Sequence, residues 1–413
     1  MQTYLVGGAI RDKLLNHPFT ERDWVVVGGS PEQMSRLGYK PVGSDFPVFL
    51  HPKTKEEYAL ARTERKSGVG YKGFQFYTGQ DVTLEQDLER RDLTINAIAQ
   101  DEQGKLIDPY NGQRDLENRV LRHVSNAFAE DPLRVLRVAR FAARYQHLGF
   151  TIADETLSLM RQLSSSGELE QLTPERVWME TEKALSESSP RTYLEALRAC
   201  GALKVLFPEV DCLFGVPQRA DYHPEIDTGL HTLMTIDQAV ALSNEPAVRF
   251  AAMVHDLGKG VTPEDILPRH IGHEERGVPL VKSLCARLKT PNHFKDLAIA
   301  ATKYHLLCHK ALTLRPATLL KLLKNLDAFR RPERFEQFLV CCEADAKGRA
   351  GFENKPYKSA TWLRETFKHL QTIDNQPLIK QGLKGQKFGK ALEQLQLEVI
   401  ANRKAAYNGD TTL

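Results

Sequence analysis

Two adjacent glycines near the start of the chain stand where a phosphate group could bind. The apolar pattern predicts a strand over residues 4–6, a turn at Gly7 and Gly8, and a helix over residues 9–15. Glycines at a strand-to-helix turn let backbone amides approach a phosphate, and a helix N-terminus favours an anion. Arg11 can add a fixed positive charge to a triphosphate. A plain turn is the alternative.

Two carboxylates follow at the entry of the next predicted strand, residues 24–27. Glu21 and Asp23 are two positions apart, and side chains with this spacing on a strand point the same way. Mg²⁺ usually takes one or two carboxylates together with substrate phosphates, so the pair is a candidate magnesium site. Glu57, on a later predicted strand, is a candidate third carboxylate, with an exposed strand glutamate as the alternative. A phosphate cradle beside paired carboxylates favours phosphoryl or nucleotidyl transfer.

Charged residues also stand within residues 84–100, which the apolar spacing predicts to be one helix. Arg91 can reach a triphosphate, and Asp92 can orient an arginine. Asn96 can bond to a sugar hydroxyl or to backbone. Solvated side chains on a helix surface are the alternative for this Arg-Arg-Asp sequence.

A later helix is predicted from Pro132, a residue that suits the first helical turn. Asp131 and Arg134 are three positions apart and can project together. An aspartate acceptor beside an arginine donor can imitate the edge of a base and so select a nucleobase without a template. Arg137 and Arg140 continue the series and would lie nearer the phosphates, with an amphipathic helix carrying solvated arginines as the alternative.

Histidine and aspartate residues in the second half of the chain predict a second metal site. His255 and Asp256 begin the sequence His-Asp-Leu-Gly-Lys at the end of a helical run. Adjacent helical residues point about 100° apart, so a metal bound by both must lie between helices. His231 is a third candidate ligand and Asp345 a fourth, which suits a divalent transition metal. Three other histidines are alternative ligands: His270, His273 and His305.

Strand and helix signals alternate over residues 1–125, with further strands predicted at residues 48–50 and 57–61, and helical signals prevail afterwards. Residues 62–79 combine glycines with basic and aromatic side chains, which favours a mobile loop that closes over a nucleotide or a single-stranded end. A plain surface loop is the alternative. The basic residues of this segment are Arg62, Arg65, Lys66 and Lys72.

Composition restricts the class of protein. At 413 residues the chain is long enough for about two or three domains, each with its own core. Its formal net charge of +3 means that a nucleic-acid surface must be a local patch. The sequence shows neither a membrane-length apolar run nor a signal pattern. Adjacent Cys341 and Cys342 are expected to be buried and reduced on a helix, and a cytoplasmic enzyme fits best.

Taken in chain order, these motifs resemble those of the bacterial CCA-adding enzymes, the class II tRNA nucleotidyltransferases. The motifs that carry the resemblance are Gly7-Gly8-x-x-Arg11-Asp12, the acidic pair, Arg90-Arg91-Asp92-x-x-x-Asn96-Ala97 and Glu130-Asp131-x-x-Arg134-x-x-Arg137. The His-Asp-Leu-Gly-Lys segment resembles the HD phosphohydrolase domain, which points to the multifunctional type of gamma- and beta-proteobacteria. The family usually has Asp-x-Asp where this chain has Glu21-Arg22-Asp23, and we expect activity to survive the added methylene.

The resemblance implies an α+β fold. A polymerase-β-like head with a mixed β-sheet and helices would be followed by an all-helical neck, an HD-type body and a tail. The corresponding predicted domains are residues 1–140 for the nucleotidyltransferase head, 141–222 for the helical neck that positions tRNA, 223–330 for the HD phosphohydrolase domain and 331–413 for the helical tail.

The resemblance also implies an activity and a role for each matching residue. The activity is addition and repair of the 3′-terminal CCA of tRNA from CTP and ATP with release of pyrophosphate. The HD domain implies metal-dependent phosphatase and 2′,3′-cyclic phosphodiesterase activity. The implied roles are catalysis and Mg²⁺ binding by Glu21 and Asp23, nucleotide binding by Gly8, Arg11, Arg91, Arg137 and Arg140, base selection by Asp131 and Arg134, catalysis by His255 and Asp256, and binding of a divalent transition metal such as Ni²⁺ by His231, His255, Asp256 and Asp345.

Two other functions remain open from the sequence. One is a poly(A) polymerase of the same superfamily, and the other is an HD phosphohydrolase whose inactive head only binds RNA. The expected partners are tRNA, CTP and ATP, with no membrane, and the expected state is a monomer or a weak homo-oligomer.

Overall fold

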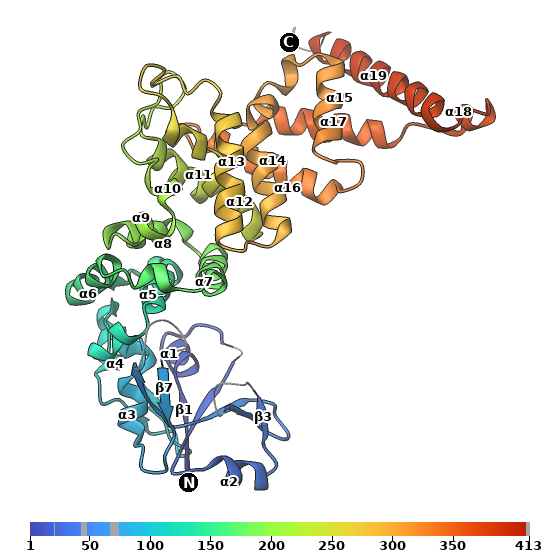
Figure 1. Cartoon of the computed structure of the whole chain (residues 1–413). Coiled ribbons are helices and arrows are strands. Elements are labelled where there is room, and N and C mark those ends of the chain that lie inside the picture. Colours follow the sequence, from blue (N-terminus) through green and yellow to red (C-terminus); the bar gives the residue numbers. More distant parts are fainter. Residues whose placement is uncertain (20, 43–47, 67–73, 410–413) are drawn as a thin grey trace. The chain divides into compact units, whose positions relative to one another are not determined.

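The computed structural model describes residues 1–19, 21–42, 48–66 and 74–409. These residues form two compact units, 1–207 and 208–413 (Figure 1). Lys72 of the predicted basic loop lies outside the described residues, and so do the side chains of Arg65 and Lys66. The predicted division into four domains is finer than these two units and stays a prediction.

A seven-stranded sheet forms the centre of the first unit within the described residues, in the order β3-β4-β5-β2-β1-β8-β9. Its strands are β1 (Gln2–Val6), β2 (Asp23–Val27), β3 (Lys40–Val42), β4 (Val48–Leu50), β5 (Glu57–Leu60), β8 (Ala99–Gln100) and β9 (Leu106–Ile107). β2 and β5 run parallel, whereas the other neighbouring strands run antiparallel. The four strands predicted in the first sixty residues are therefore confirmed, and the mixed sheet matches the predicted head.

The sheet separates two apolar clusters because successive strand residues point to opposite faces. On β2, Val25 belongs to one cluster together with Val6 and Leu88, and the next residue, Val26, belongs to the other together with Phe49. All five side chains are buried. The central strands therefore have a core on each side, which fixes the register of β2 and of the carboxylates at its start.

Helices complete the first unit (Figure 1). They are α1 (Gly8–Leu14), α2 (Pro31–Arg36), α3 (Leu84–Glu89), α4 (Gly112–Asn118), α5 (Leu133–Tyr145), α6 (Asp154–Ser165), α7 (Pro174–Ser186), α8 (Pro190–Ala199) and α9 (Ala202–Leu206). Pro132 directly precedes α5, in keeping with the helix start predicted there, and Thr173 directly precedes α7. α5 packs against α7 and α8, which places its arginines between the sheet and the following helices.

The single helix predicted over residues 84–100 is wrong. α3 ends at Glu89, and a short 3₁₀ turn, η2 (Thr94–Asn96), and strand β8 follow. Hydrogen bonds to residues distant in sequence replace those of a helix here. The Thr94 amide donates to the Arg122 carbonyl (2.9 Å), and the Thr94 hydroxyl donates to Asp115 (2.7 Å). Leu84, Leu88, Ile95 and Ala99 are all buried, and their burial produced a spacing that a helix would also give.

The loop predicted over residues 62–79 is also wrong in part. β6 (Thr63–Lys66) and β7 (Phe74–Tyr77) form an antiparallel ladder that flanks the undescribed residues 67–73. Phe74, Phe76 and Tyr77 have high strand propensity. The loop was predicted because glycines occur next to these residues.

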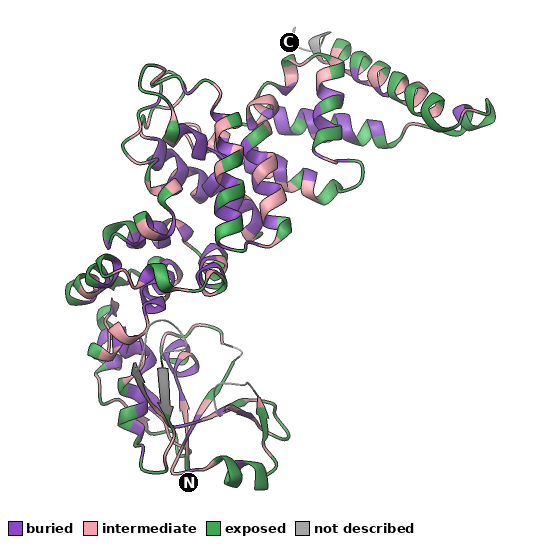
Figure 2. Ribbon diagram, in the orientation of Figure 1, coloured by how far each residue is buried: buried purple, intermediate pink, exposed green. Residues whose placement is uncertain are grey.

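The regular elements of the second unit are all helices within its described residues. They are α10 (Pro208–Asp211), α11 (Thr228–Leu242), α12 (Pro246–Val254), η6 (Leu257–Val261), α13 (His273–Arg287), α14 (Asn292–His309), η7 (Ala311–Thr313), α15 (Pro316–Asn325), α16 (Pro332–Lys347), α17 (Lys358–Gln371), α18 (Gln376–Lys380) and α19 (Gly385–Gly409). α12 packs against α11, α14 and α16, and residues 247–254 are all buried (Figure 2). A helix that is buried on every side lies inside a bundle, so the C-terminal end of α12 and the histidine that follows it lie in the protein interior.

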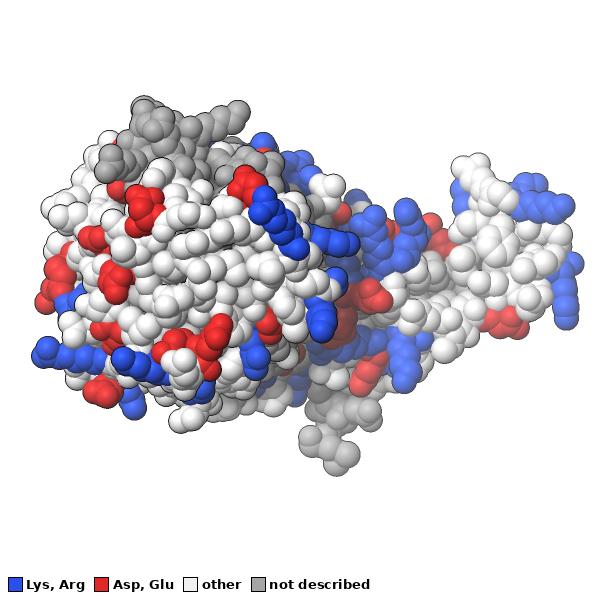
Figure 3. Space-filling model, turned by 90° about the horizontal axis from the view of Figure 1, so that it is seen from below, with Lys and Arg blue, Asp and Glu red and all other residues white. Residues whose placement is uncertain are grey.

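Other expectations from composition can be compared with the structure. Cys341 and Cys342 lie buried on α16 and form no disulfide, as predicted. No helix among the described residues is long and apolar enough to cross a membrane. Acidic and basic side chains are interspersed on the face seen in Figure 3, in keeping with the small net charge.

Candidate functional site

A cavity of about 870 Å³ in the first unit collects the sequence-predicted residues of the head. Among the residues that line it are Gly8, Arg11, Glu21, Asp23, Glu57, Arg91, Asp92, Asn96, Asp131, Arg134, Arg137 and Arg140. They come from α1, β2, β5, α5, the residues just before β2 and α5, and the segment after α3. A volume of this size lies within the range of cavities that enclose a small organic ligand.

Three carboxylates near the start of the parallel strand pair line the same cavity. Asp23 on β2 is the register partner of Glu57 on β5, so the two side chains stand on neighbouring strands on one face of the sheet. Glu21 lies two residues before β2 and lines the same cavity. Partial burial raises the pKa of Asp23, Arg91 opposes the shift, and the neighbouring charge of Glu21 adds to it.

This carboxylate group fits a hard divalent cation. Within the described residues, none of the three side chains receives a hydrogen bond or an ion pair from another side chain. Neighbouring carboxylates repel one another, as the effect of Glu21 on the pKa of Asp23 indicates, and oxygen ligands of this kind are those that Mg²⁺ and similar ions prefer. The candidate third carboxylate is therefore in the position expected of it.

The glycine turn brings an arginine close to the backbone. Gly7 has a φ of 71°, a conformation that residues with a side chain rarely adopt. A Cβ atom at Gly7 would lie 3.0 Å from Nη1 of Arg91, so the guanidinium packs directly on the turn. Positive charge and the N-terminus of α1 thus meet at the turn, which suits a phosphate.

Arg11 belongs to a buried hydrogen-bonded network that sequence reasoning did not foresee. Its guanidinium donates to both carboxylate oxygens of Asp12 at 2.9 Å and to Oδ1 of Asn96 at 2.5 Å. Asn96 in turn donates to Asp92 Oδ1 at 2.9 Å. The role predicted for Asp92 matches its contacts, because Arg137 Nε lies 2.7 Å from its Oδ2. The Asn96 side chain therefore bonds to the side chains of Arg11 and Asp92 and not to the backbone.

The ion pair between Asp92 and Arg137 gives a testable consequence for stability. Burial raises the pKa of Asp92, but Arg137 and the other donors lower it further, so the carboxyl is charged and its pKa lies well below the usual range. Replacing Asp92 by Ala would leave Arg137 without its closest partner, and we expect the free energy of unfolding of the first unit to fall by about 3 kcal/mol. The measurement is a urea titration followed by the fluorescence of Trp24 and Trp178 in a Trp362→Phe background.

The matched control for this prediction is Glu195→Ala. Glu195 forms a surface ion pair with Arg191 at 2.8 Å, and its side chain is 45% exposed. Exposed pairs of this kind contribute less than about 1 kcal/mol. Equal losses for Asp92→Ala and Glu195→Ala would contradict the assignment of Asp92 as a buried structural anchor.

The remaining α5 arginines bind acidic residues that the sequence analysis missed. Arg140 donates to Glu180 on α7 at 2.7 Å and lies 3.5 Å from Glu187, and Arg137 lies 3.8 Å from Glu180. Glu180 lies on α7 and Glu187 directly follows its last residue, so no local sequence pattern marks the two as partners of the same arginine. These contacts tie the arginine helix to α7.

Asp131 and Arg134 both line the cavity, but each is bonded to other protein groups. Arg134 donates to the carbonyls of Ala127 and Arg90, both at 2.6 Å. Asp131 accepts from Arg176 at 2.8 Å and from the Leu133 amide at 3.1 Å. The structure therefore fixes the orientation of both side chains, and their role in reading a base stays a prediction.

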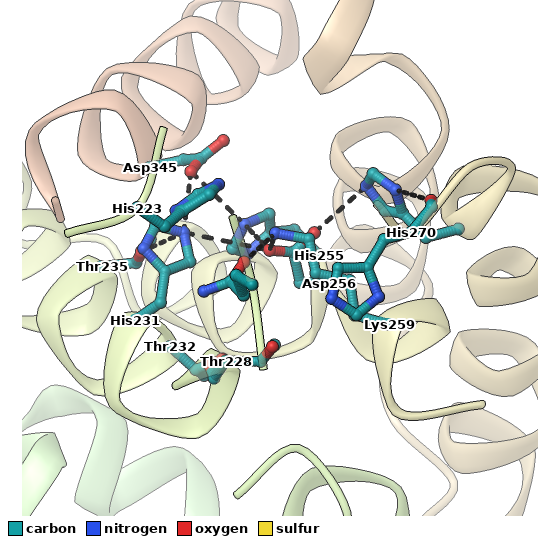
Figure 4. A network of polar contacts seen from close by, with 12 residues as sticks. His223, Thr228, His231, Thr232, Thr235, His255, Asp256, Lys259, His270 and Asp345 are labelled. Carbon is teal, nitrogen blue, oxygen red and sulfur yellow. Dashed lines mark hydrogen bonds and ion pairs between the residues drawn. The ribbon is translucent and has the colours of Figure 1, made fainter. Parts of the chain in front are cut away.

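The four residues predicted for the second metal site converge in the second unit (Figure 4). His231 lies on α11, His255 and Asp256 follow α12, and Asp345 lies on α16. His231 Nε2 lies 3.0 Å from Asp345 Oδ1, and His255 Nε2 lies 3.2 Å from Asp256 Oδ2. All four are buried, and the donor atoms of His231, His255 and Asp345 lie within 4.8 Å of one another.

Outer contacts fix the histidine rings. His231 Nδ1 lies 2.9 Å from Glu225 and 3.2 Å from the Gly348 carbonyl, and His255 Nδ1 lies 2.8 Å from the Ala252 carbonyl. Because these partners accept hydrogen bonds, each Nδ1 carries a proton and each Nε2 is the ring nitrogen that faces the site. Glu225 was not recognised from the sequence, although it stands six residues before His231.

The donor set fits a transition metal. Within the described residues, His255 Nε2 and both oxygens of Asp256 lack a hydrogen-bond partner of suitable geometry, although all are buried. Burial lowers the pKa of His255, but the carboxylates of Asp256 and Asp345 raise it to about 10, so the cluster attracts positive charge. Imidazole nitrogen with carboxylate oxygen is a common ligand set for such ions.

The alternative ligand His270 lies apart from this set. Its Nδ1 contacts the Thr262 hydroxyl at 2.7 Å and its Nε2 contacts the Pro217 carbonyl at 3.0 Å, so both ring nitrogens are engaged elsewhere. The other two alternatives, His273 and His305, lie within 4 Å of Asp256 instead.

Two of the family models that match this chain cover the two sites described above. Residues 3–122 match the model of the poly A polymerase head domain, and residues 228–331 match the HD domain. Residues 149–213 match the model described as the probable RNA and SrmB-binding site of polymerase A.

Individual proteins are similar over nearly the whole chain. The multifunctional CCA protein of Thioalkalivibrio sulfidiphilus is 59% identical over 99% of this chain and 100% of its own length. That of Acinetobacter baumannii is 60% identical over 98% of both chains. The solved structure of the Thermotoga maritima CCA-adding enzyme complexed with tRNA shares the fold, with a TM-score of 0.64 and 22% identity over 98% of this chain and 91% of that chain.

Proposed function

Because the chain belongs to the family of multifunctional CCA proteins, we propose that it adds C, C and A to the 3′ ends of tRNA from CTP and ATP. The chain is a nucleotidyltransferase with an HD domain. The observation that carries the proposal is the cavity of the first unit, where the carboxylates of β2 and β5 face the arginines of α5 and of the segment after α3.

In the proposed head reaction, the arginines and the glycine turn bind the triphosphate. Gly8, Arg11, Arg91, Arg137 and Arg140 supply this binding, and Asp131 with Arg134 reads the base. Glu21 and Asp23 hold Mg²⁺, with Glu57 beside them. When bound, the ion neutralises charge on the phosphates and supports attack by the tRNA 3′ hydroxyl with release of pyrophosphate. The buried network of Asp92 and Asn96 keeps Arg11 and Arg137 in place.

In the proposed HD reaction, the second unit hydrolyses phosphomonoesters and 2′,3′-cyclic phosphodiesters. His231, His255, Asp256 and Asp345 hold a divalent transition metal such as Ni²⁺, which when bound lowers the pKa of water for attack on phosphorus. Such a reaction would clean damaged tRNA ends before nucleotides are added. Glu225 orients His231 for this role.

The remaining features of the proposal concern partners and organisation. The protein acts in the cytoplasm on tRNA as a monomer or a weak homo-oligomer. Its head spans residues 1–140, its neck 141–222, its HD domain 223–330 and its tail 331–413. Helices α5 to α9, most of which follow the head, would position the tRNA.

The test uses a tRNA transcript that ends before CCA, with Mg²⁺ and labelled CTP and ATP given singly and together. We expect about two C additions with CTP alone and one A only after them, as the proposed reaction requires. An open-ended ladder of A would establish poly(A) synthesis instead. No incorporation, with hydrolysis of a 2′,3′-cyclic nucleotide retained, would leave the head as an RNA-binding module.

A further inference from the structure

An arginine without a protein partner follows α16, next to the metal site of the second unit. Arg349 stands four positions after Asp345, directly beyond the Gly348 cap of this helix. Its side chain is half-buried, and its Nε is fully buried without a hydrogen-bond partner. Among the described residues, the Arg349 side chain forms neither a hydrogen bond nor an ion pair. Burying a guanidinium without acceptors costs free energy, which a ligand with acceptor oxygens would offset.

The backbone on both sides of Arg349 contacts residues that surround the metal site. The Gly348 carbonyl lies 3.2 Å from Nδ1 of His231, and the Ala350 amide donates to Oε2 of Glu225 at 3.3 Å. Glycine at position 348 permits this approach, because a Cβ there would lie 2.7 Å from the backbone of α11. The packing of α16 against α11 therefore holds the start of the arginine side chain beside the site.

The positive charge of Arg349 reaches His223, which lies at the edge of the same site. The His223 ring packs edge-on against the ring of His231, with 4.6 Å between the centroids, and its Nδ1 lies 3.0 Å from Oε1 of Glu225 (Figure 4). Burial and nearby positive charges, that of Arg349 among them, lower the pKa of His223 to about 4. Because charges act in this way only at short range, the guanidinium lies close to the site.

Two neighbouring basic side chains, in contrast, have acceptors within the protein. Lys259 Nζ lies 2.6 Å from Oδ2 of Asp256, which directs its charge to a metal ligand. Lys347, the last residue of α16, pairs with Glu343 at 3.0 Å. Arg349 therefore differs from these two lysines in keeping its N–H donors for a ligand.

We propose that Arg349 binds the phosphate group of the substrate at this site, by donating hydrogen bonds to its oxygens. A guanidinium presents a planar fork of N–H donors that matches two oxygens of a phosphate. The ligand class is phosphomonoesters and 2′,3′-cyclic phosphodiesters, a choice that rests on the proposed function of the second unit. Arg349 is not a metal ligand. It holds the phosphate beside the histidines and stabilises its negative charge.

The first test measures the binding of inorganic phosphate to the full-length protein. The protein is loaded with Co²⁺ in excess Mg²⁺, which occupies oxygen-rich sites but competes weakly for nitrogen ligands. Phosphate is then titrated while the visible absorption of Co²⁺ reports its binding at the histidine-rich site. We expect the dissociation constant for phosphate to rise at least about tenfold in Arg349→Gln. The rise should be smaller in Arg349→Lys, which keeps the charge but loses the fork.

The matched control is Arg330→Gln, which changes an arginine of the same unit whose side chain is 79% exposed. Its affinity for phosphate should be within about twofold of that of the unsubstituted protein. The affinity for Co²⁺ should not fall in any variant, because no metal ligand is removed. Weaker Co²⁺ binding by Arg349→Gln would make the residue a structural support of the metal site and overturn the proposal. Equal phosphate affinities of Arg349→Gln and Arg330→Gln, or no response to phosphate in the unsubstituted protein, would overturn it as well.

The second test separates the phosphate subsite from the proposed hydrolysis. With a 2′,3′-cyclic nucleotide as substrate, we expect the KM of Arg349→Gln to rise at least about tenfold, and that of Arg330→Gln to stay within about twofold. Hydrolysis by Arg349→Gln with an unchanged KM would refute the role of Arg349 and leave the proposed function intact. Phosphate binding that depends on Arg349, in a protein that hydrolyses no phosphoester, would keep the subsite and refute the hydrolytic function.

Discussion

Asp23→Asn should abolish nucleotide addition, with a loss of at least about a thousandfold in the rate of CTP incorporation. Asp23 is the carboxylate at the first position of β2, in register with Glu57, and it lines the cavity together with Arg91. The amide keeps the size of the side chain but removes the charge that a divalent cation requires. The measurement is single-turnover incorporation of labelled CTP into a tRNA transcript that ends before CCA.

Two controls separate a metal defect from a folding or binding defect. Glu56→Gln alters the carboxylate next to Glu57 in sequence, whose Oε2 accepts a hydrogen bond from the Trp24 ring at 3.2 Å, and should retain most of the activity. The affinity of Asp23→Asn for tRNA should be within about twofold of the unsubstituted protein, because the removed charge is negative and adds no contact to a phosphate. Normal incorporation by Asp23→Asn would show that the chemistry of the head lies elsewhere.

Glu21→Asp tests the one departure from the family pattern. The shorter side chain gives the Asp-x-Asp sequence, and the position keeps a carboxylate in the lining of the same cavity. We expect incorporation within about tenfold of the unsubstituted protein, since an ion can adjust its water ligands to a shift of one methylene. Glu21→Gln, measured in the same assay, should lose at least about a hundredfold, and equal rates for Glu21→Asp and Glu21→Gln would remove Glu21 from the metal site.

In the head, the sequence predicted the features that depend on residues close together in the chain. Val25 and Val26 alternate between two cores, so β2 and the direction of Asp23 could be derived from a period of two residues. Hydrogen-bond partners that are distant in sequence could not be derived in this way. Asn96 lies 85 positions from Arg11, and only the folded chain shows that Arg11 Nη1 donates to Asn96 Oδ1.

The incorrect prediction of one helix over residues 84–100 also arose because contacts between distant residues are not visible in the sequence. Leu88 and Ile95 face the core with a spacing that a helix would also produce, but Thr94 bonds to Arg122 and Asp115, which a single-sequence pattern does not place nearby. In the second unit the sequence motif identified His255 and Asp256, and His273 and His305 were already candidate ligands. The structure added Glu225 and the contact between the Nε2 atoms of His273 and His305. Metal ligands can be recognised from a motif, whereas the groups that orient them depend on helix packing.

His255→Gln should remove phosphoester hydrolysis while leaving nucleotide addition unchanged. His255 lies at the C-terminal end of the buried helix α12, and its Nε2 faces the carboxylates of Asp256 and Asp345 at 3.2 and 3.7 Å. Glutamine removes the imidazole nitrogen, a strong ligand for transition metals, so we expect hydrolysis of a 2′,3′-cyclic nucleotide to fall by at least about a thousandfold. CTP incorporation should stay within about twofold, because the head residues lie in the other unit.

The control is a histidine of the same unit with both nitrogens bonded elsewhere. His270→Gln loses contacts to Thr262 and Pro217 but no ligand atom, so its hydrolytic rate should stay within about tenfold of the unsubstituted protein. Treatment of the unsubstituted protein with a chelator should reproduce the His255→Gln defect, and addition of Ni²⁺ should restore the chelated protein but not the variant. Because burial holds the His255 ring against Asp256, rescue of His255→Gln by Ni²⁺ would mean that the ion binds without this histidine, and the assignment of the site would have to move to the pair formed by His273 and His305.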